Sequence, residues 1–279
     1  MSPSTIEKKV KQAVAFLQKS GIPSADVGLV LGSGLGGFAE QFSEKIIIPY
    51  SEIPGFAPST VTGHKGQLVF SSFQGVNLLM MQGRYHIYEG HEALQSALPI
   101  LVMHALDVTI LIATTASGGL NPLFSPGDLM IIRDHVNLLF QNPLRGFRWG
   151  DRPTKIDMSS PYSDRLIRIA RDAAIKKGIP LKEGVYISAP GPNYETNAEI
   201  RMMRQIGDAV SMSTVPEILM ARYLNMETLG ISCITNSALP VRSKKTTHEE
   251  VIETGRAVEK KFFDLTTTIL QDIAVYYNC

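Results

Sequence analysis

The fold class of this chain is decided by the stretch Val27-Gly28-Leu29-Val30-Leu31-Gly32-Ser33-Gly34-Leu35-Gly36-Gly37. Its first five residues carry no polar side chain, which predicts a strand buried on both faces, and glycines end that strand at once. Strands of this kind occur in sheets that helices cover on both sides. The sequence therefore predicts an α/β protein.

Helical and strand patterns alternate along the rest of the chain. The expected helices cover residues 5–19, 92–106, 163–177, 198–206 and 251–276, with capping boxes at Ser4-x-x-Glu7 and at Thr246 or Thr247. The expected strands cover residues 68–73 and 76–81, which flank Gln74-Gly75 as a hairpin, and 108–113, 128–133, 185–188 and 227–235. Residues 141–162 read as a long surface loop. Because no linker, repeat or change in composition divides the chain, we expect a single domain over 1–279.

Composition and charge exclude several classes of protein. Of the 279 residues, 44% are hydrophobic and 19% are charged, which is typical of a globular protein and not of a disordered chain, collagen or a coiled coil. The net charge of +1 gives no field that would attract nucleic acid. No apolar run is long enough for a signal peptide or a membrane span, and the two cysteines, Cys233 and Cys279, form no disulfide framework. We expect a cytoplasmic protein.

The glycines after the first strand satisfy the pattern G-x-G-x-x-G, which is the fingerprint of a dinucleotide-binding loop. That fold also needs a full helix and then a strand ending in an acidic residue, whereas here Pro49 interrupts the next apolar run. An NAD-dependent oxidoreductase is thus a weaker interpretation. The same glycines, with Ser33 beside them, could bind a phosphate-sized anion through backbone N–H groups, or could simply form a tight turn.

A second polar loop, Gly83-Arg84-Tyr85-His86-Ile87-Tyr88-Glu89-Gly90, follows the predicted hairpin. In an extended chain Arg84, His86 and Tyr88 share a face, and a guanidinium beside an imidazole suits an oxyanion. The alternative is a surface pair between Arg84 and Glu89. His64 lies between glycines in a further loop, where a solvated turn residue is the alternative to a ligand.

Three further loops follow predicted strands and should meet at the carboxyl edge of the sheet, where α/β proteins bind ligands. They contain residues 114–120, 188–196 and 234–237. Tyr194 can stack on a planar ring, Glu195 can accept hydrogen bonds from its N–H groups, and Asn236 can both donate and accept. Alternatively, Glu195 places its charge at the first turn of a helix over 196–206, and Asn236 caps the loop that follows it. No metal-ligand spacing occurs, and no nucleophile elbow accompanies His135.

Eight motifs, taken in this order, resemble those of the trimeric purine nucleoside phosphorylases. They are Gly32-Ser33-Gly34-Leu35-Gly36, Gly63-His64, Gly83-Arg84-x-His86-x-Tyr88-Glu89-Gly90, Ala116-x-Gly118-Gly119, Gly191-Pro192-x-Tyr194-Glu195-Thr196, Met212-Ser213-Thr214-Val215-Pro216-Glu217, Thr235-Asn236 and His248-Glu249-Glu250. The resemblance, over about residues 25–260, implies a mixed central β-sheet flanked by helices and a homotrimer. It also implies phosphorolysis of purine nucleosides to free base and ribose or deoxyribose 1-phosphate, with inorganic phosphate as co-substrate and no cofactor or metal.

The resemblance assigns roles to the residues that match the motifs. It implies phosphate binding by Ser33, His64, Arg84, His86, the backbone amide of Ala116 and Ser213. It implies a ribose site of Tyr88, Met212 and His248, and a purine site of Tyr194, Glu195, Asn236 and the backbone near Ser117 and Gly118. His86 would position phosphate, and Asn236 would donate a hydrogen bond toward N7 of the purine as that base gains negative charge.

The resemblance also indicates the base. Members that act on 6-oxopurines carry Thr-Asn where this chain has Thr235-Asn236, so we expect cleavage of inosine and guanosine in preference to adenosine. The resemblance places His248 beside the ribose 5′-hydroxyl. A polar residue there also favours inosine and guanosine, because the methylthio group of methylthioadenosine would need an apolar neighbour. A methylthioadenosine or adenosine phosphorylase is the alternative.

Four positions depart from the family pattern. Thr115, Ser117 and Ser211 replace the usual residues near the base, which leaves open a binding protein without turnover. No Phe follows Gly150-Asp151-Arg152, where the family offers an aromatic residue to a neighbouring subunit; Trp149 or Tyr162 could replace it. A nucleoside hydrolase is unsupported, because no calcium-binding aspartates are present.

Overall fold

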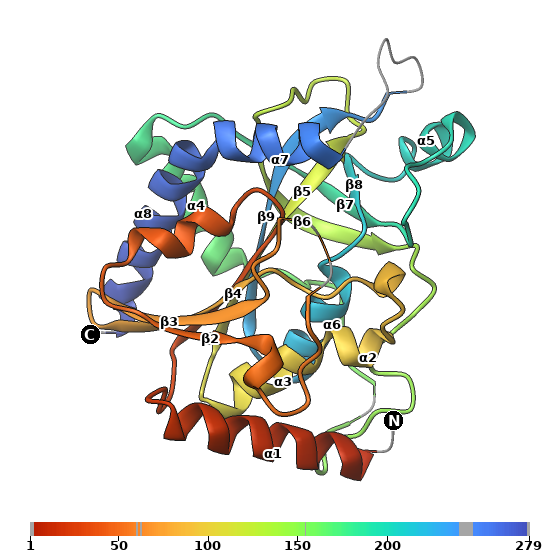
Figure 1. Ribbon diagram of the computed structural model, residues 1–279. Helices are drawn as coiled ribbons and strands as arrows, with labels where there is room; N and C mark the ends of the chain where they lie inside the picture. The colour runs from red at the N-terminus through yellow and green to blue at the C-terminus, as the bar shows by residue number, and fades with distance from the viewer. Residues whose placement is uncertain (1–2, 60, 62, 154, 240–247, 278–279) are drawn as a thin grey trace.

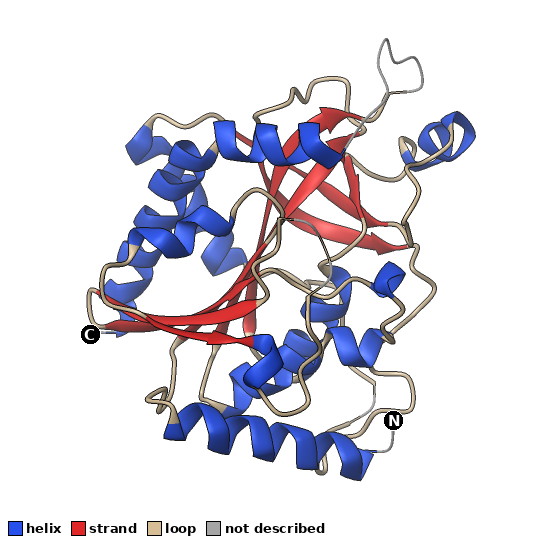
Figure 2. Ribbon diagram, in the orientation of Figure 1, coloured by secondary structure: helices blue, strands red, loops and turns tan. Residues whose placement is uncertain are grey.

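The computed structural model describes residues 3–59, 61, 63–153, 155–239 and 248–277. In this part of the chain a nine-stranded mixed sheet lies between two groups of helices (Figures 1 and 2). The strands are β1 (Val27–Leu31), β2 (Ile46–Pro49), β3 (Gln67–Phe73), β4 (Val76–Gln82), β5 (Ile110–Gly119), β6 (Leu129–Asn137), β7 (Leu181–Ser188), β8 (Ala209–Ser211) and β9 (Glu227–Ser237). The predicted α/β class and the mixed sheet are confirmed.

Strand β1 lies at the centre of the sheet, parallel to β4 on one side and to β5 on the other. All five of its residues are buried, as the apolar run predicted. The hairpin of β3 and β4 also forms as predicted, and Gln74 (φ 51°) and Gly75 (φ 83°) make its turn. Positive φ at both turn residues is what a two-residue hairpin of this twist requires.

Five strands close into a ring beside the central strand. Strand β5 pairs with both β8 and β9, β9 pairs with β6, and β7 joins β6 to β8. The expectation that residues 114–119 form a loop after a short strand is therefore wrong, because β5 continues to Gly119. Pairing with strands from distant parts of the chain holds these small residues extended.

Helices cover both faces of the sheet (Figure 1). One face packs against α1 (Pro3–Lys19), α2 (Ala93–Ser96), α3 (Leu98–Ala105) and α6 (Val215–Tyr223), and the other against α4 (Asp164–Lys177), α7 (His248–Ala257) and α8 (Glu259–Tyr277). The short α5 (Asn197–Met203) packs at the edge near β7 and β8. None of the helices among the described residues is long and apolar enough to cross a membrane.

Helix ends follow the sequence signals in some places and not in others. Helix α4 begins after its cap Ser163 and ends at Gly178, as predicted. Helix α1 begins at Pro3, so Ser4 lies within its first turn and not at the cap. The expected helix 92–106 is two helices, and the expected helix 251–276 divides between α7 and α8. Thr246 and Thr247 lie outside the described residues.

Neither β8 nor α6 is predicted from the sequence. Helix α6 begins directly after Thr214, whose φ of 73° is unusual for a β-branched residue, and Pro216 occupies its first turn. The sequence pattern predicts no secondary structure for the motif that runs from Met212 to Glu217. The structure shows instead a helix that starts at the carboxyl edge of the sheet.

The described residues of the segment 141–162 form no helix or strand, as predicted, but part of this segment packs inside the protein. Tyr162 is buried and its hydroxyl lies 3.2 Å from His135 Nδ1. Trp149 stacks on Phe147, and its backbone N–H donates to the Tyr223 hydroxyl. The interpretation of Tyr162 as an aromatic residue offered to a neighbouring subunit is wrong, because its side chain is inside this one.

Candidate active site

A pocket of about 490 Å³ lies at the carboxyl edge of the sheet. It brings together all of the predicted site residues except two histidines. Those that line it are Ser33, Arg84, His86, Tyr88, Ala116, Ser117, Gly118, Tyr194, Glu195, Met212, Ser213 and Asn236. His64 does not line the pocket but lies 3.1 Å from Ser33 Oγ through its Nε2, and the side chain of His248 lies outside the described part of the chain. The roles assigned to these residues remain predictions.

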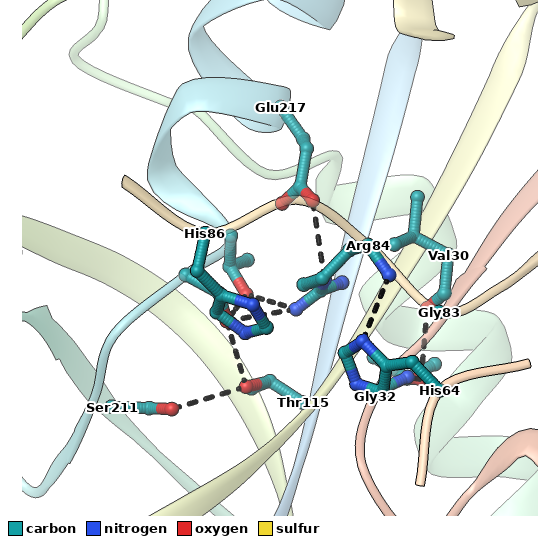
Figure 3. A network of polar contacts seen from close by, with 12 residues as sticks. Val30, Gly32, His64, Gly83, Arg84, His86, Thr115, Ser211 and Glu217 are labelled. Carbon is teal, nitrogen blue, oxygen red and sulfur yellow. Dashed lines mark hydrogen bonds and ion pairs between the residues drawn. The ribbon is translucent and has the colours of Figure 1, made fainter. Parts of the chain in front are cut away.

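Arg84 is the most deeply buried charged residue of the pocket. Its Nε lies 3.1 Å from Oε1 of Glu217, and Nη1 donates to the hydroxyls of Ser213 (2.9 Å) and Thr214 (3.0 Å), as Figure 3 shows in part. The alternative of an exposed pair with Glu89 is therefore wrong. Nη2 is buried and has no hydrogen-bond partner among the described residues. A buried, unsatisfied guanidinium N–H is a site that an anion would fill.

Glu217 balances the charge of Arg84. It stands in the first turn of α6, and its side chain is 4% exposed. Burial raises the pKa of this carboxyl, whereas the neighbouring Arg84 lowers it. Sequence reasoning did not single out Glu217 as a functional residue, although an acidic residue among the apolar residues of a helix indicates a buried partner.

The backbone around Ser213 is fixed by two further hydroxyls. Those of Tyr186 (3.0 Å) and Ser188 (2.8 Å) both donate to the Ser213 carbonyl oxygen. The carbonyl is thereby turned toward β7, while the Ser213 side chain faces Arg84 and the pocket. The N-terminus of α6, with its positive partial charge, follows immediately.

His86 is held by Glu89 and stacks with Tyr88. Oε1 of Glu89 accepts from the His86 backbone N–H at 2.7 Å and lies 3.1 Å from ring Nδ1. The rings of His86 and Tyr88 are 4.7 Å apart, and burial raises the pKa of Tyr88 to about 12. The predicted grouping of Arg84, His86 and Tyr88 on one side of the loop agrees with this arrangement.

The opposite end of the pocket carries no basic side chain among the described residues. Tyr194, Glu195 and Asn236 line it. The Thr235 hydroxyl donates to Oδ1 of Asn236 at 3.1 Å, so Nδ2 is the donor that the amide offers to a ligand. Gly118 permits this packing, because a Cβ there would lie 3.2 Å from that Nδ2.

Glu195 does not cap the next helix. Helix α5 is capped by Thr196, whose hydroxyl accepts from the backbone N–H of Glu199, while the Glu199 carboxylate accepts from the Thr196 backbone N–H. The acidic residue in the first turn of this helix is Glu199, so the alternative role of Glu195 is filled by another residue. This leaves Glu195 as a hydrogen-bond acceptor in the wall of the pocket.

Hydroxyl side chains occupy the positions that depart from the family pattern. Thr115 Oγ1 lies 3.3 Å from Ser213 Oγ and 3.4 Å from Ser211 Oγ. The Ser232 hydroxyl donates to that of Ser117 at 2.7 Å. These residues satisfy one another, and Thr115 and Ser211 extend the hydrogen bonding that surrounds Ser213.

The glycine loop does not lead into a dinucleotide-binding unit. The residues after it form a short 3-10 helix, Gly36–Gln41, in place of a full helix. The following strand, β2, lies at the edge of the sheet and pairs antiparallel with β3. Since the fold for NAD binding needs a parallel strand there, the oxidoreductase interpretation is wrong.

Comparisons with known proteins agree with this geometry. The model of the phosphorylase superfamily matches residues 26–271. The chain is 48% identical to purine nucleoside phosphorylase 1 of Geobacillus stearothermophilus over 95% of this chain and 97% of the relative. A crystal structure of a schistosoma purine nucleoside phosphorylase with hypoxanthine has a TM-score of 0.89 at 34% identity, covering 94% of this chain and 96% of that chain. A second, from Schistosoma mansoni with adenosine, has a TM-score of 0.87 at 34% identity and the same coverage.

The ion pair between Arg84 and Glu217 yields a stability prediction. In phosphate-free buffer, Glu217→Ala should lower the free energy of unfolding by about 3–5 kcal/mol, because it leaves a buried guanidinium unpaired. The double variant Arg84→Met/Glu217→Leu should lose less than this single variant. Urea denaturation measures both. As a control, Glu183→Ala removes the half-buried partner of the exposed Arg171 and should cost about 0–1 kcal/mol. A double variant no more stable than Glu217→Ala would contradict the argument.

Proposed function

The chain belongs to the phosphorylase superfamily and is a purine nucleoside phosphorylase, and from this premise we propose how its pocket divides between the two substrates. Inorganic phosphate binds at the end formed by Ser33, Arg84, His86 and Ser213. The purine binds at the end formed by Tyr194, Glu195 and Asn236. The ribose lies between them, against Tyr88 and Met212.

One observation carries this assignment: Nη2 of Arg84 is buried, faces no partner among the described residues, and belongs to a residue that lines the pocket. A phosphate oxygen would supply the missing acceptor. The guanidinium is already oriented by Glu217, Ser213 and Thr214, so little ordering remains when the anion binds. The purine end offers no comparable group for an anion.

The reaction proposed for this arrangement needs two substrates and no resident cofactor. A phosphate oxygen forms a bond to the anomeric carbon of the ribose while the bond from that carbon to the purine nitrogen breaks. The bonding electrons pass to the purine, and Nδ2 of Asn236 stabilises them by donating toward N7. The anionic phosphate stabilises the positive charge that develops on the ribose. His86, fixed by Glu89, keeps the phosphate in line.

We propose that the preferred bases are 6-oxopurines, as in inosine and guanosine. A 6-oxygen accepts hydrogen bonds and shares the negative charge that develops beside N7, whereas a 6-amino group donates. The Asn236 side chain suits a 6-oxygen better than a 6-amino group, because the Thr235 hydroxyl already donates to Oδ1 and leaves the Nδ2 donor for the base. The two similar crystal structures contain hypoxanthine and adenosine respectively, so fold alone does not choose the base.

We propose that the enzyme is a homotrimer, and the surface gives one observation in support. Phe140 is 87% exposed and has a φ of 54°. A large apolar side chain on strained backbone is more easily explained if a second copy covers it. Light scattering coupled to gel filtration should give three chains for the wild type and fewer for Phe140→Asp. A monomeric wild type would overturn this proposal.

Phosphate binding is tested by removing the charge of Arg84. The variant Arg84→Gln/Glu217→Gln avoids leaving a buried carboxylate unpaired, and its KM for phosphate should rise about 10- to 100-fold, the worth of a charged hydrogen bond. The KM for inosine should change little. Arg171→Gln, which changes an exposed arginine, serves as the control. Cleavage of inosine that does not depend on phosphate would contradict the proposed function.

The base preference is tested at Asn236. We expect Asn236→Ala to lower kcat/KM for inosine by about 100-fold, as removal of a donor to a developing anion does elsewhere. The loss for adenosine should be about tenfold smaller. Asn77→Ala, at the hairpin of β3 and β4, is a control. Equal losses on the two nucleosides would show that Asn236 does not select the base.

A further inference from the structure

His64 is the predicted phosphate ligand that does not line the pocket. Its two ring nitrogens have different partners. Nδ1 lies 3.3 Å from the backbone nitrogen of Arg84, which donates to it, and Nε2 lies 3.1 Å from Ser33 Oγ. Figure 3 shows Nδ1 facing the Arg84 backbone. His64 thus contacts both Ser33 and Arg84, which line the pocket, although His64 itself does not line it.

The partner of Nδ1 fixes the protonation of the ring. A backbone N–H can only donate, so Nδ1 must hold a lone pair and carry no proton. An imidazole with a bare Nδ1 is neutral and has its proton on Nε2. That N–H can then donate to the oxygen of Ser33, which acts as the acceptor. A serine that accepts in this way keeps its own hydroxyl proton for another partner.

We propose that His64 is a positioning residue for Ser33: its Nε2–H donates to Ser33 Oγ and turns the serine hydroxyl proton toward the phosphate. The inference rests on the proposed function, since it takes phosphate as the ligand of this end of the pocket. It differs from a direct ionic contact between an imidazolium and the anion. His64 acts on phosphate only through Ser33.

The surroundings of the ring favour its neutral form. Burial is the main cause that lowers the pKa of His64 to about 3, and the neighbouring His86 and Arg84 lower it further, while Glu89 opposes the shift. The His64 and His86 rings stack 5.4 Å apart. At pH values from about 5 to 8 a group with this pKa is uncharged. A cation here would lie between an arginine and a second histidine.

The backbone also keeps the ring in place. Gly83 has a φ of 111°, and a Cβ there would lie 2.7 Å from the Cβ of His64 and 3.0 Å from its Cγ. The Gly83 carbonyl oxygen accepts from the buried hydroxyl of Tyr50 at 2.7 Å. The peptide group whose N–H donates to Nδ1 is therefore held through its own carbonyl oxygen and by the close packing of Gly83 on His64. A pre-oriented donor costs less ordering when the ligand binds.

A double-mutant cycle on phosphate binding separates a relay from a direct contact. We expect Ser33→Ala and His64→Ala each to raise the KM for phosphate, by about tenfold and about three- to tenfold, with little change in the KM for inosine. The double variant should be no worse than Ser33→Ala alone, because His64 has nothing to position once the hydroxyl is gone. Multiplied losses would show that His64 binds phosphate independently and would overturn the proposal.

His104→Gln is the matched control. His104 is a half-buried histidine near the end of α3 that does not line the pocket. Its replacement should leave the KM for phosphate within about twofold of the wild type. A similar rise in His104→Gln and His64→Ala would mean that loss of any histidine of this kind impairs the enzyme, and the relay would be rejected.

The position of the proton on the His64 ring can be measured without an activity assay. Nitrogen NMR of the wild-type enzyme labelled in its histidine rings, with the His64 signal assigned by its absence in His64→Ala, should show one neutral ring protonated at Nε2 from about pH 5 to pH 8. A proton on Nδ1, or an imidazolium, would overturn the inference even in an active enzyme. Should the proposed phosphate site be wrong, the kinetic losses would be absent while this spectrum would persist, so the two failures are distinguishable.

Discussion

The pocket depends on the buried ion pair between Arg84 and Glu217. A guanidinium that is 1% exposed is stable only when its charge and its N–H groups are satisfied. Glu217 supplies the charge, and Ser213 and Thr214 supply acceptors for Nη1. This requires α6 to begin at the edge of the sheet, directly opposite the loop that follows β4. The positive φ of Thr214 is the backbone distortion that accompanies this close start.

The ring of strands beside β1 sets the distance between the two ends of the pocket. Strand β5 contributes Ala116, Ser117 and Gly118 to the lining, and its partner β9 carries Asn236 to the far end. The register between these two strands shifts after Ser117, so the amide of Asn236 packs beside Gly118. The end that holds Arg84 and the end that holds Glu195 and Asn236 are thereby separate parts of one sheet edge. A nucleoside bridges them only if its sugar lies between the two.

The sequence predicts those elements whose signals are local. Strand β1 is recognisable because every residue faces a covered side, and α4 because Ser163 and Gly178 mark its ends. The second half of β5 is not, since its small polar residues become a strand only by pairing with β8 and β9. For Arg84 the sequence offers only the nearby Glu89 as an alternative partner, whereas the structure brings Glu217 from a distant helix. The loop residues of the pocket could be predicted as a group, because the carboxyl ends of parallel strands lie at the same edge of a sheet. Their individual hydrogen bonds could not be predicted from the sequence.

The two stacked histidines show why residue type alone does not define a role. In His64 the backbone of Arg84 occupies Nδ1, so the proton of the neutral ring lies on Nε2. In His86 the carboxylate of Glu89 lies at Nδ1, so a neutral ring carries its proton there, and Nε2 has the character of an acceptor. In the proposed assignment, Arg84 and Ser33 supply donors to the bare oxygens of the phosphate dianion. The two rings therefore carry opposite tautomers because one faces a backbone N–H and the other a carboxylate, which the residue type alone does not reveal.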